Sequence, residues 1–216
     1  MSISGATSCR IIDNTDDFYD ENSPDDGREG GSWLHRNVTC RAGYFLAFVS
    51  APIAASADLL LGSIASVASI LTGGLIQPVN EAAQSMTRAG GAGLANTYFG
   101  LIRLINPAAP IQVETGMISN FVSKKLLNLG GKLRESDNLF TRHVLSRIVY
   151  LGSALSSVPL RIIDFVIGIF AALGSLVTVG KFKTLNDRAC AGLHIALIVY
   201  DLYIGLVKTI NPWTKF

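Results

Sequence analysis

After its first 33 residues, this chain contains one apolar sequence pattern twice. Residues 34–83 align with residues 140–189 without a gap, and 13 of the 50 aligned positions are identical. A composition this skewed would give roughly four identities by chance. The two copies also end alike, in GLIRLINP at 100–107 and GLVKTINP at 205–212, where the offset changes from 106 to 105. We therefore expect an internally duplicated protein in which each copy is one structural unit.

Each copy begins with a long apolar block that predicts helix rather than strand. The blocks exceed the usual length of a strand and show no alternation with a period of two. In the first copy, residues 59–76 carry no charge, and a helix of this length measures about 27 Å, close to the thickness of the hydrocarbon core of a bilayer. In the second copy the uncharged run is shorter, 165–180, and Arg147, Arg161 and Asp164 interrupt the stretch before it. The first block is thus the stronger candidate for crossing a membrane.

The predicted fold class is all-α, with two similar helical lobes. Residues 1–29 hold eight acidic residues against two arginines, and such a segment cannot bury enough apolar area to offset the entropy of ordering. Asn-Pro at 106–107 and at 211–212 should end helices, because proline disfavours helical geometry in the residue before it. The expected organisation is a disordered acidic tail at 1–32, helical repeat 1 at 33–110, an amphipathic linker at 111–137 that breaks at Gly130-Gly131, and helical repeat 2 at 138–216.

Small and polar residues recur at identical positions in the two apolar blocks. Their spacing of four, three, four and three residues places them on one face of a helix. A stripe of small residues lets two backbones approach closely, which is how helices pack in lipid, although buried helices of soluble proteins use the same device. We expect the two halves to pack stripe against stripe. The two rows are Asp58, Gly62, Ala65, Ser69, Thr72 and Asp164, Gly168, Ala171, Ser175, Thr178.

The aspartate that heads each row has three interpretations. As a helix-start residue, it would place a carboxylate near the positive end of the helix dipole. As an intramembrane carboxylate, it could belong to an ion or proton path, since such groups are costly in lipid and duplicated halves are a feature of transporters. In the third interpretation each block closes as a hairpin halfway along, near residues 50–52 and 156–159, and a partly buried ion pair forms. The pairs would be Arg41 with Asp58 and Arg147 with Asp164.

The sequence carries little that indicates catalysis. His35, His143 and His194 are isolated and lack the spacing of metal ligands, and the three cysteines, Cys9, Cys40 and Cys190, show no paired spacing. No nucleophile elbow, phosphate-binding loop or zinc-protease motif is present. Basic residues are scattered among apolar ones without the aromatic platform that single-stranded nucleic acid needs. We expect a protein that is not an enzyme, binds no metal or cofactor, and does not bind nucleic acid.

The segment LSRIVYLGSALSSVPLRIIDFVIGIFAALGSLVTVGKFKTLND at 145–187 resembles hydrophobic hypothetical proteins of chlamydia-like obligate intracellular bacteria, in which a similar run ends in a GKFKxLN pattern. The paired apolar lobes are also similar to those of chlamydial inclusion-membrane proteins. That resemblance implies export by type III secretion through a Ser-rich N-terminus and insertion into the membrane of a host-derived vacuole. The chain differs in having two blocks about 106 residues apart where those proteins carry one, and the resemblance supplies no catalytic residues.

Only 16% of the residues are charged and the mean hydropathy is +0.39, so much of the surface need not face water. We expect a membrane-associated helical protein with a structural or interaction role, in contact with lipid and with copies of itself or a host protein. Its polar joints and tails should lie on one side of the membrane, where Lys181, Lys183 and the basic linker would satisfy the positive-inside rule. The alternatives are a secreted soluble helical effector that binds a partner, and a small transporter or channel.

Overall fold

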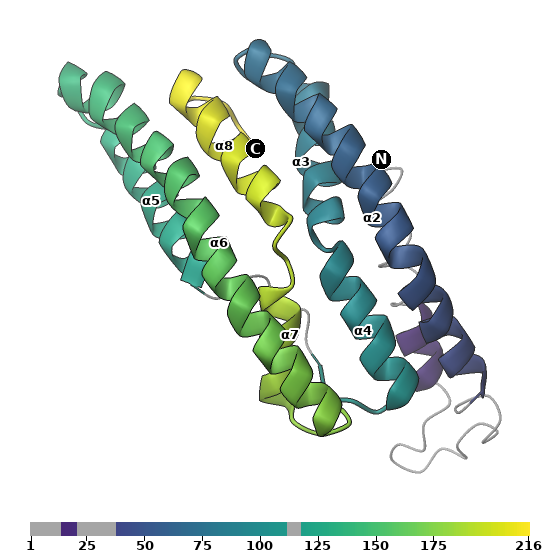
Figure 1. Cartoon of the computed structure of the whole chain (residues 1–216). Coiled ribbons are helices and arrows are strands. Elements are labelled where there is room, and N and C mark those ends of the chain that lie inside the picture. Colours follow the sequence, from purple (N-terminus) through teal and green to yellow (C-terminus); the bar gives the residue numbers. More distant parts are fainter. Residues whose placement is uncertain (1–13, 21–37, 112–117) are drawn as a thin grey trace.

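The computed structural model describes residues 14–20, 38–111 and 118–216, and these residues form helices and turns without a strand (Figure 1). The predicted all-α class is confirmed. Seven helices of ten residues or more follow one another along the described chain. They are α2 (Cys40–Leu71), α3 (Gln77–Gly91), α4 (Gly93–Ile105), α5 (Ile118–Arg134), α6 (Ser146–Val177), α7 (Lys183–Gly192) and α8 (Leu197–Ile210), and a π-helical turn, Thr141–Leu145, leads directly into α6.

Helices α2, α3 and α4 form one hairpin. The long helix α2 runs in one direction, and α3 and then α4 return along it. Glycines permit the close approach: a Cβ on Gly62 would lie 2.6 Å from the backbone nitrogen of Thr87, and a Cβ on Gly100 would lie 2.8 Å from that of Phe48. The first hairpin is therefore closed along its whole length by backbone-to-backbone packing.

Helices α6, α7 and α8 form a second hairpin of the same construction. Here α6 is the long helix, and the return helix is bent by 54° where α7 meets α8. A Cβ on Gly168 would lie 2.7 Å from the Cα of Gly192, and one on Gly205 would lie 2.6 Å from the Cβ of Ala154. In addition, α5 packs on the other side of α6, and the described residues include no helix of that length in the same place on α2.

The two hairpins turn through the same backbone geometry. After α2, the Gly74 amide donates to the Ser69 carbonyl at 2.8 Å, and after α6 the Gly180 amide donates to the Ser175 carbonyl at 2.8 Å. Both turns need residues with positive φ. Gly74 and Gly180 have φ of 70° and 67° and are preceded by Gly73 and Val179 at 59° and 54°. Such left-handed residues end helices by satisfying the last carbonyl groups.

Each hairpin fastens the turn of the other. The Asn106 side chain, just after α4, donates to the Val179 carbonyl at 3.0 Å, and the Asn211 side chain, just after α8, donates to the Gly73 carbonyl at 3.1 Å. Each asparagine is the residue at which its helix ends, as the Asn-Pro pairs predicted. The exchange requires the hairpins to run in opposite directions, and Figure 1 shows α2 and α6 antiparallel, with α3, α4 and α8 between them.

This arrangement corrects two predictions about packing. Among the described helices, α2 and α6 do not pack stripe against stripe; the hairpins meet where α8 packs against α3 and α2 and where α7 packs against α4. The turn at 178–182 lies at one end of the molecule, together with Asn106. The end of α5 lies at the other, where Arg134 donates to the Pro212 carbonyl at 3.1 Å. Lys181, Lys183 and the basic linker are therefore not on one side.

The predicted hairpins halfway along each apolar block are wrong. Helix α2 continues through Pro52 and α6 through Pro159. A proline within a helix removes a single backbone donor, which neighbouring helices can tolerate. Arg41 and Asp58 lie 17 residues apart on one continuous helix, about 25 Å along its axis, so the predicted pair does not form. The pairing of Arg147 with Asp164 fails for the same reason.

The structure differs from the prediction in the acidic tail, which was expected to be disordered, and in the linker, which was expected to be an amphipathic helix broken at Gly130-Gly131. Within the acidic tail, residues 14–20 form a short helix that packs on α2, held by a 2.5 Å hydrogen bond from the Tyr44 hydroxyl to Asp16. The rest of the tail lies outside the described residues. In the linker, α5 does not break at Gly130-Gly131. Gly130 lies against the Tyr150 ring, where a Cβ would be 2.5 Å from Cε1, so it serves close packing instead of ending the helix.

Candidate functional site

The most distinctive feature of α2 is the distribution of its side chains. Large apolar residues cover the outward side, with Leu60 and Ile64 each 68% exposed and Leu71 81% exposed. The inward side, which faces α3 and α4, is small and polar, with buried Asp58, Ser66 and Ser69. A water-soluble helix shows the opposite arrangement.

Helix α6 repeats this reversed polarity. Phe170 is 70% exposed and Val177 is 84% exposed, whereas Arg161, Asp164 and Ser175 are buried. Of the three charged residues that interrupt the second apolar block, Arg161 and Asp164 therefore face inward, and Arg147, near the beginning of α6, is exposed. In the described part of the chain, two helices are long and apolar enough to cross a membrane, Cys40–Leu71 and Thr141–Val177, and the bent pair of α7 and α8 passes the same test when taken as one span. The first begins at Cys40, well before the uncharged run 59–76, and ends at Leu71, five residues before that run ends.

The residues of the predicted rows lie where α2 and α6 meet their own return helices. Ala65 is half-buried, Ala171 is buried, and both threonines cap the turns, with Oγ1 of Thr72 donating to the Ala68 carbonyl at 3.0 Å and that of Thr178 to the Gly174 carbonyl at 2.9 Å. Gly62 and Gly168 make the close helix contacts described above. Arg41 is exposed, so the structure separates it from the row it was expected to pair with.

The serines of the two rows belong to matching polar clusters that join the hairpins. Ser69 donates to the Asn80 side chain, and Tyr203 of α8 lies 3.3 Å from Ser69 Oγ. In the other cluster, Ser175 donates to the Asn186 side chain, and the Tyr98 hydroxyl of α4 donates to the same amide oxygen at 3.4 Å. Each tyrosine comes from the opposite hairpin, so these clusters hold the two hairpins together.

Asp164 does not start a helix, because it lies within α6, but it caps one. Its Oδ1 accepts from the Ile118 amide at 3.1 Å, and its Oδ2 accepts from the Ser119 amide at 3.0 Å and the Ser119 hydroxyl at 2.5 Å. Ile118 and Ser119 are the first residues of α5. The helix-start interpretation expected Asp164 to begin its own helix, and this is wrong, because Asp164 caps α5 instead. Its physical reason, a carboxylate at the positive end of a helix dipole, holds.

Asp58 occupies the equivalent position in α2 with different surroundings. It is 2% exposed, and its Oδ1 accepts no hydrogen bond from the described residues. A buried polar atom without a partner costs on the order of 1–3 kcal/mol. The two aspartates that the sequence makes equivalent are therefore unequal in the folded chain.

The second hairpin contains a buried ion pair that the sequence reasoning missed. Arg161 Nε lies 2.8 Å from Asp201 Oδ2, and the two side chains are 2% and 9% exposed. Arg161 Nη2 also donates to the Asn120 side chain of α5 at 2.6 Å, while Nη1 has no partner among the described residues. Two opposite charges in otherwise apolar segments were the available signal, since charges inside a membrane usually pair.

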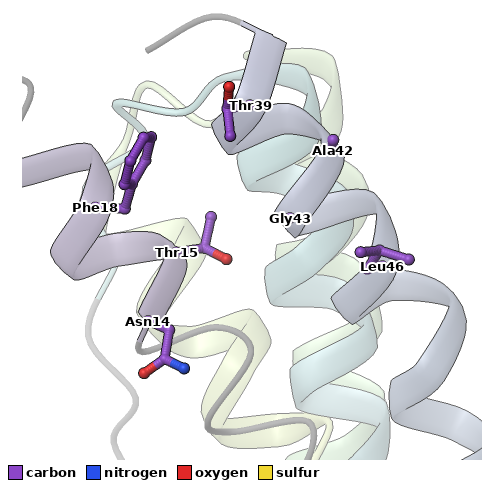
Figure 2. Close-up of a pocket in the computed structure, with 7 residues that line it drawn as sticks. All are labelled: Asn14, Thr15, Phe18, Thr39, Ala42, Gly43 and Leu46. Atoms are coloured by element: carbon purple, nitrogen blue, oxygen red, sulfur yellow. The ribbon is translucent and has the colours of Figure 1, made fainter. Parts of the chain in front are cut away.

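A shallow pocket lies where the short helix 14–20 crosses the beginning of α2 (Figure 2). Figure 2 shows Thr15 pointing toward Gly43, with Phe18 near Thr39. A Cβ on Gly43 would lie 2.5 Å from Thr15 Oγ1, so the two segments touch. Asp16 also lies 3.9 Å from Arg103 of α4, which ties this segment to both arms of the first hairpin.

Histidines and cysteines do not gather in the described residues, where no group of three or more His, Cys, Asp or Glu is placed to hold a metal. His194 is buried in the bend between α7 and α8, with Nδ1 2.5 Å from the Cys190 carbonyl oxygen. His143 lies beside the Trp213 ring. His35 and Cys9 lie outside the described residues.

In comparisons with known proteins, no family model, no curated protein and no solved structure matches this chain.

Proposed function

We propose that this chain is an integral membrane protein whose helical hairpins form a lipid-embedded scaffold with a structural or interaction role. One observation carries the proposal: the longest helices bury their polar side chains and expose their large apolar ones. In water, each exposed side chain of this size would forgo about 1.5–3 kcal/mol of burial. The same surface is favourable in the hydrocarbon core of a bilayer. It also disfavours the soluble effector among the alternatives.

The duplication is part of the same proposal. Matching turns, matching Ser-Asn clusters and reciprocal Asn-to-carbonyl bonds support an origin of both hairpins from one ancestral unit. Because the hairpins are antiparallel, the axis that relates them would lie in the plane of the membrane. The first turn, at 72–76, would then reach one membrane surface and the second turn, at 178–182, the other.

The destination of the protein rests on the sequence resemblance alone. On that basis we propose insertion into a bacterial membrane or, after type III secretion, into the membrane of a host-derived vacuole. Contact with host proteins or with other copies of the chain would give the scaffold its role. Catalysis, cofactors and nucleic acid have no part in this proposal.

Alkaline carbonate extraction of membranes that contain the full chain tests the proposal. The expected result is that the protein stays in the pellet and is released only by detergent. Release into the supernatant would contradict it. Size-exclusion chromatography without detergent provides an independent second measurement. An integral membrane protein should aggregate when the detergent is removed, whereas a soluble protein would remain monodisperse.

A transporter or channel is a second candidate, favoured by one further observation. Asp58, Asp164 and Arg161 lie near the middle of the long helices, beside the points where the return helices break, and Arg161 pairs with Asp201 in the first half of α8. Binding sites of transporters with inverted repeats lie at this depth, next to broken helices. Reconstituted protein with both Asp58→Asn and Asp164→Asn would lose ion or proton flux under this candidate. Under the scaffold proposal, reconstituted wild-type protein shows no flux above empty vesicles.

A further inference from the structure

The end of the molecule that carries the first turn also carries a cluster of basic and aromatic side chains. The C-terminal segment, residues 211–216, crosses this end after α8. Arg134 at the end of α5 donates to the Pro212 carbonyl at 3.1 Å, and Lys208 near the end of α8 donates to the Thr214 carbonyl at 3.3 Å. Residues from α5, α8 and the turn before α6 thus converge on one short segment.

Aromatic rings, more than carboxylates, hold the cations of this cluster. Arg142 lies 6.0 Å from the centre of the Trp213 ring, and Lys208 lies 5.3 Å from the Phe216 ring and 5.5 Å from the Tyr150 ring. Such contacts stabilise a cation through the face of the ring without neutralising its charge. Among the described residues, the carboxylate that pairs with a cation of this cluster is that of Glu135, 3.4 Å from Arg134, while Glu81 of α3 lines a small pocket together with Lys215 and Phe216.

The opposite end of the molecule differs. There, Lys183 lies 2.5 Å from Asp187 and Arg103 lies 3.9 Å from Asp16. Two of its cations are thus matched by nearby carboxylates, whereas Arg142 and Lys208 at the first end contact rings and carbonyl groups. The first end therefore has N–H donors and positive charge available for an external anion.

Large apolar side chains surround the basic cluster. Leu139 is 70% exposed, Phe140 61%, Trp213 42% and Phe216 39%. Tryptophan next to arginine and lysine at the end of membrane-spanning helices is typical of the zone where hydrocarbon meets headgroups. An anion bound here would lie above a surface that itself contacts acyl chains.

We propose that this basic-aromatic cluster, formed by Arg134, Arg142, Lys208, Trp213, Lys215 and Phe216, binds the headgroups of anionic phospholipids. The inference rests on the proposed membrane insertion and adds which leaflet the first turn faces, namely the more anionic one. The phosphate and any further negative charge of the headgroup accept from the Arg and Lys donors, while Trp213 and Phe216 pack on the upper acyl chain. Each basic residue near an anionic surface contributes roughly a fivefold gain in affinity.

Fluorescence quenching of Trp213 tests the proposal. The full chain carries Trp33→Phe, so that Trp213 is the reporter, and is titrated in a neutral detergent with brominated phosphatidylglycerol or phosphatidylcholine. We expect half-maximal quenching by phosphatidylglycerol at a concentration at least tenfold lower than by phosphatidylcholine. Equal quenching by the two lipids would overturn the proposal.

Two matched variants give specificity. The triple substitution R142Q/K208Q/K215Q should remove the preference for phosphatidylglycerol, and R41Q/K181Q/R188Q, which removes three exposed cations assigned to the opposite end, should retain it. A loss of preference in both variants would indicate a general charge effect and contradict the site. Competition by inorganic phosphate as strong as that by the lipid would show that the cluster binds free phosphate instead. Failure of membrane insertion would be evident separately, as a protein that stays monodisperse without detergent.

Discussion

The two hairpins share their turns and their Ser-Asn clusters, yet they differ in what surrounds the repeated aspartate. In the second hairpin, α5 presents two amides and a hydroxyl to Asp164, and Arg161 is paired with Asp201 nearby. In the first, Asp58 has an oxygen without a partner, and the positions equivalent to Arg161 and Asp201 are Ala55 and Asn96. Residues that are identical in the two hairpins thus need not have identical roles, because the residues around them differ: α5 has no described counterpart of its length on α2, and Arg161 and Asp201 correspond to Ala55 and Asn96.

The largest expected effect concerns the buried ion pair. Arg161→Ala leaves Asp201 uncompensated in a site that is nine-tenths buried, and we expect a loss of about 3–5 kcal/mol in the free energy of unfolding. The double variant R161A/D201N gives the second hairpin the neutral residues of the first and should recover most of that loss. Thermal or denaturant unfolding in detergent measures both. If the double variant is no more stable than R161A alone, the neutral residues of the first hairpin cannot replace the ion pair of the second, and the comparison fails.

The next effect compares the two aspartates directly. Asp164→Asn weakens three hydrogen bonds to a charged acceptor and should cost about 2 kcal/mol. Asp58→Asn removes a buried charge without losing a bond at Oδ1, so its effect should be near zero or stabilising. The comparison is contradicted if the two substitutions lower the melting temperature equally.

The two asparagines that follow the turns should behave alike. Asn80 donates to the Gly74 carbonyl at 2.7 Å and Asn186 to the Gly180 carbonyl at 2.8 Å, and each also accepts from a serine. Replacing either by alanine should cost about 1–3 kcal/mol by leaving buried polar groups unpaired. Asn186 makes two further bonds, donating to the Pro110 carbonyl at 2.8 Å and accepting from the Tyr98 hydroxyl at 3.4 Å, so its variant should be the less stable of the two. If Asn80→Ala leaves the free energy of unfolding unchanged, the first turn does not depend on this cluster.

The smallest effect separates glycines that pack from those that do not. A Cβ on Gly152 of α6 meets nothing within 4 Å, so Gly152→Ala should stabilise the helix by about 0.5–1 kcal/mol. Gly130→Ala should destabilise, because its Cβ would meet the Tyr150 ring. Equal effects in an unfolding experiment would show that the ring moves aside freely and that α5 is loosely held.

The sequence predicts those parts of this structure that depend on local chemistry. Long uncharged runs predicted the helices, Asn-Pro predicted the ends of α4 and α8, and identical positions predicted the inward face of α2 and α6. Two local signals failed: Pro52 and Pro159 suggested turns, and Gly130-Gly131 suggested a break. In each case, packing along a neighbouring helix outweighs the preference of one residue.

The candidate site was predicted in part for the same reason. The rows placed Ser69 and Ser175 correctly on the inward face, but the tyrosines of their clusters come from the other hairpin. Tyr203 is 134 residues from its partner Ser69, and Tyr98 is 88 residues from its partner Asn186. Asp164 caps α5, and α5 has no described counterpart of its length in the first half. Such long-range partners are fixed by how the hairpins meet, and no local pattern encodes that.

Site-directed labelling tests the central claim, that two antiparallel hairpins cross one membrane, most directly. Single cysteines at Leu75→Cys in the first turn and Lys181→Cys in the second, in a chain whose three native cysteines are replaced by serine, are treated with a membrane-impermeant maleimide in sealed, uniformly oriented vesicles. We expect one position to react before the vesicles are opened and the other only after. Reaction of both positions from the same side would contradict the account.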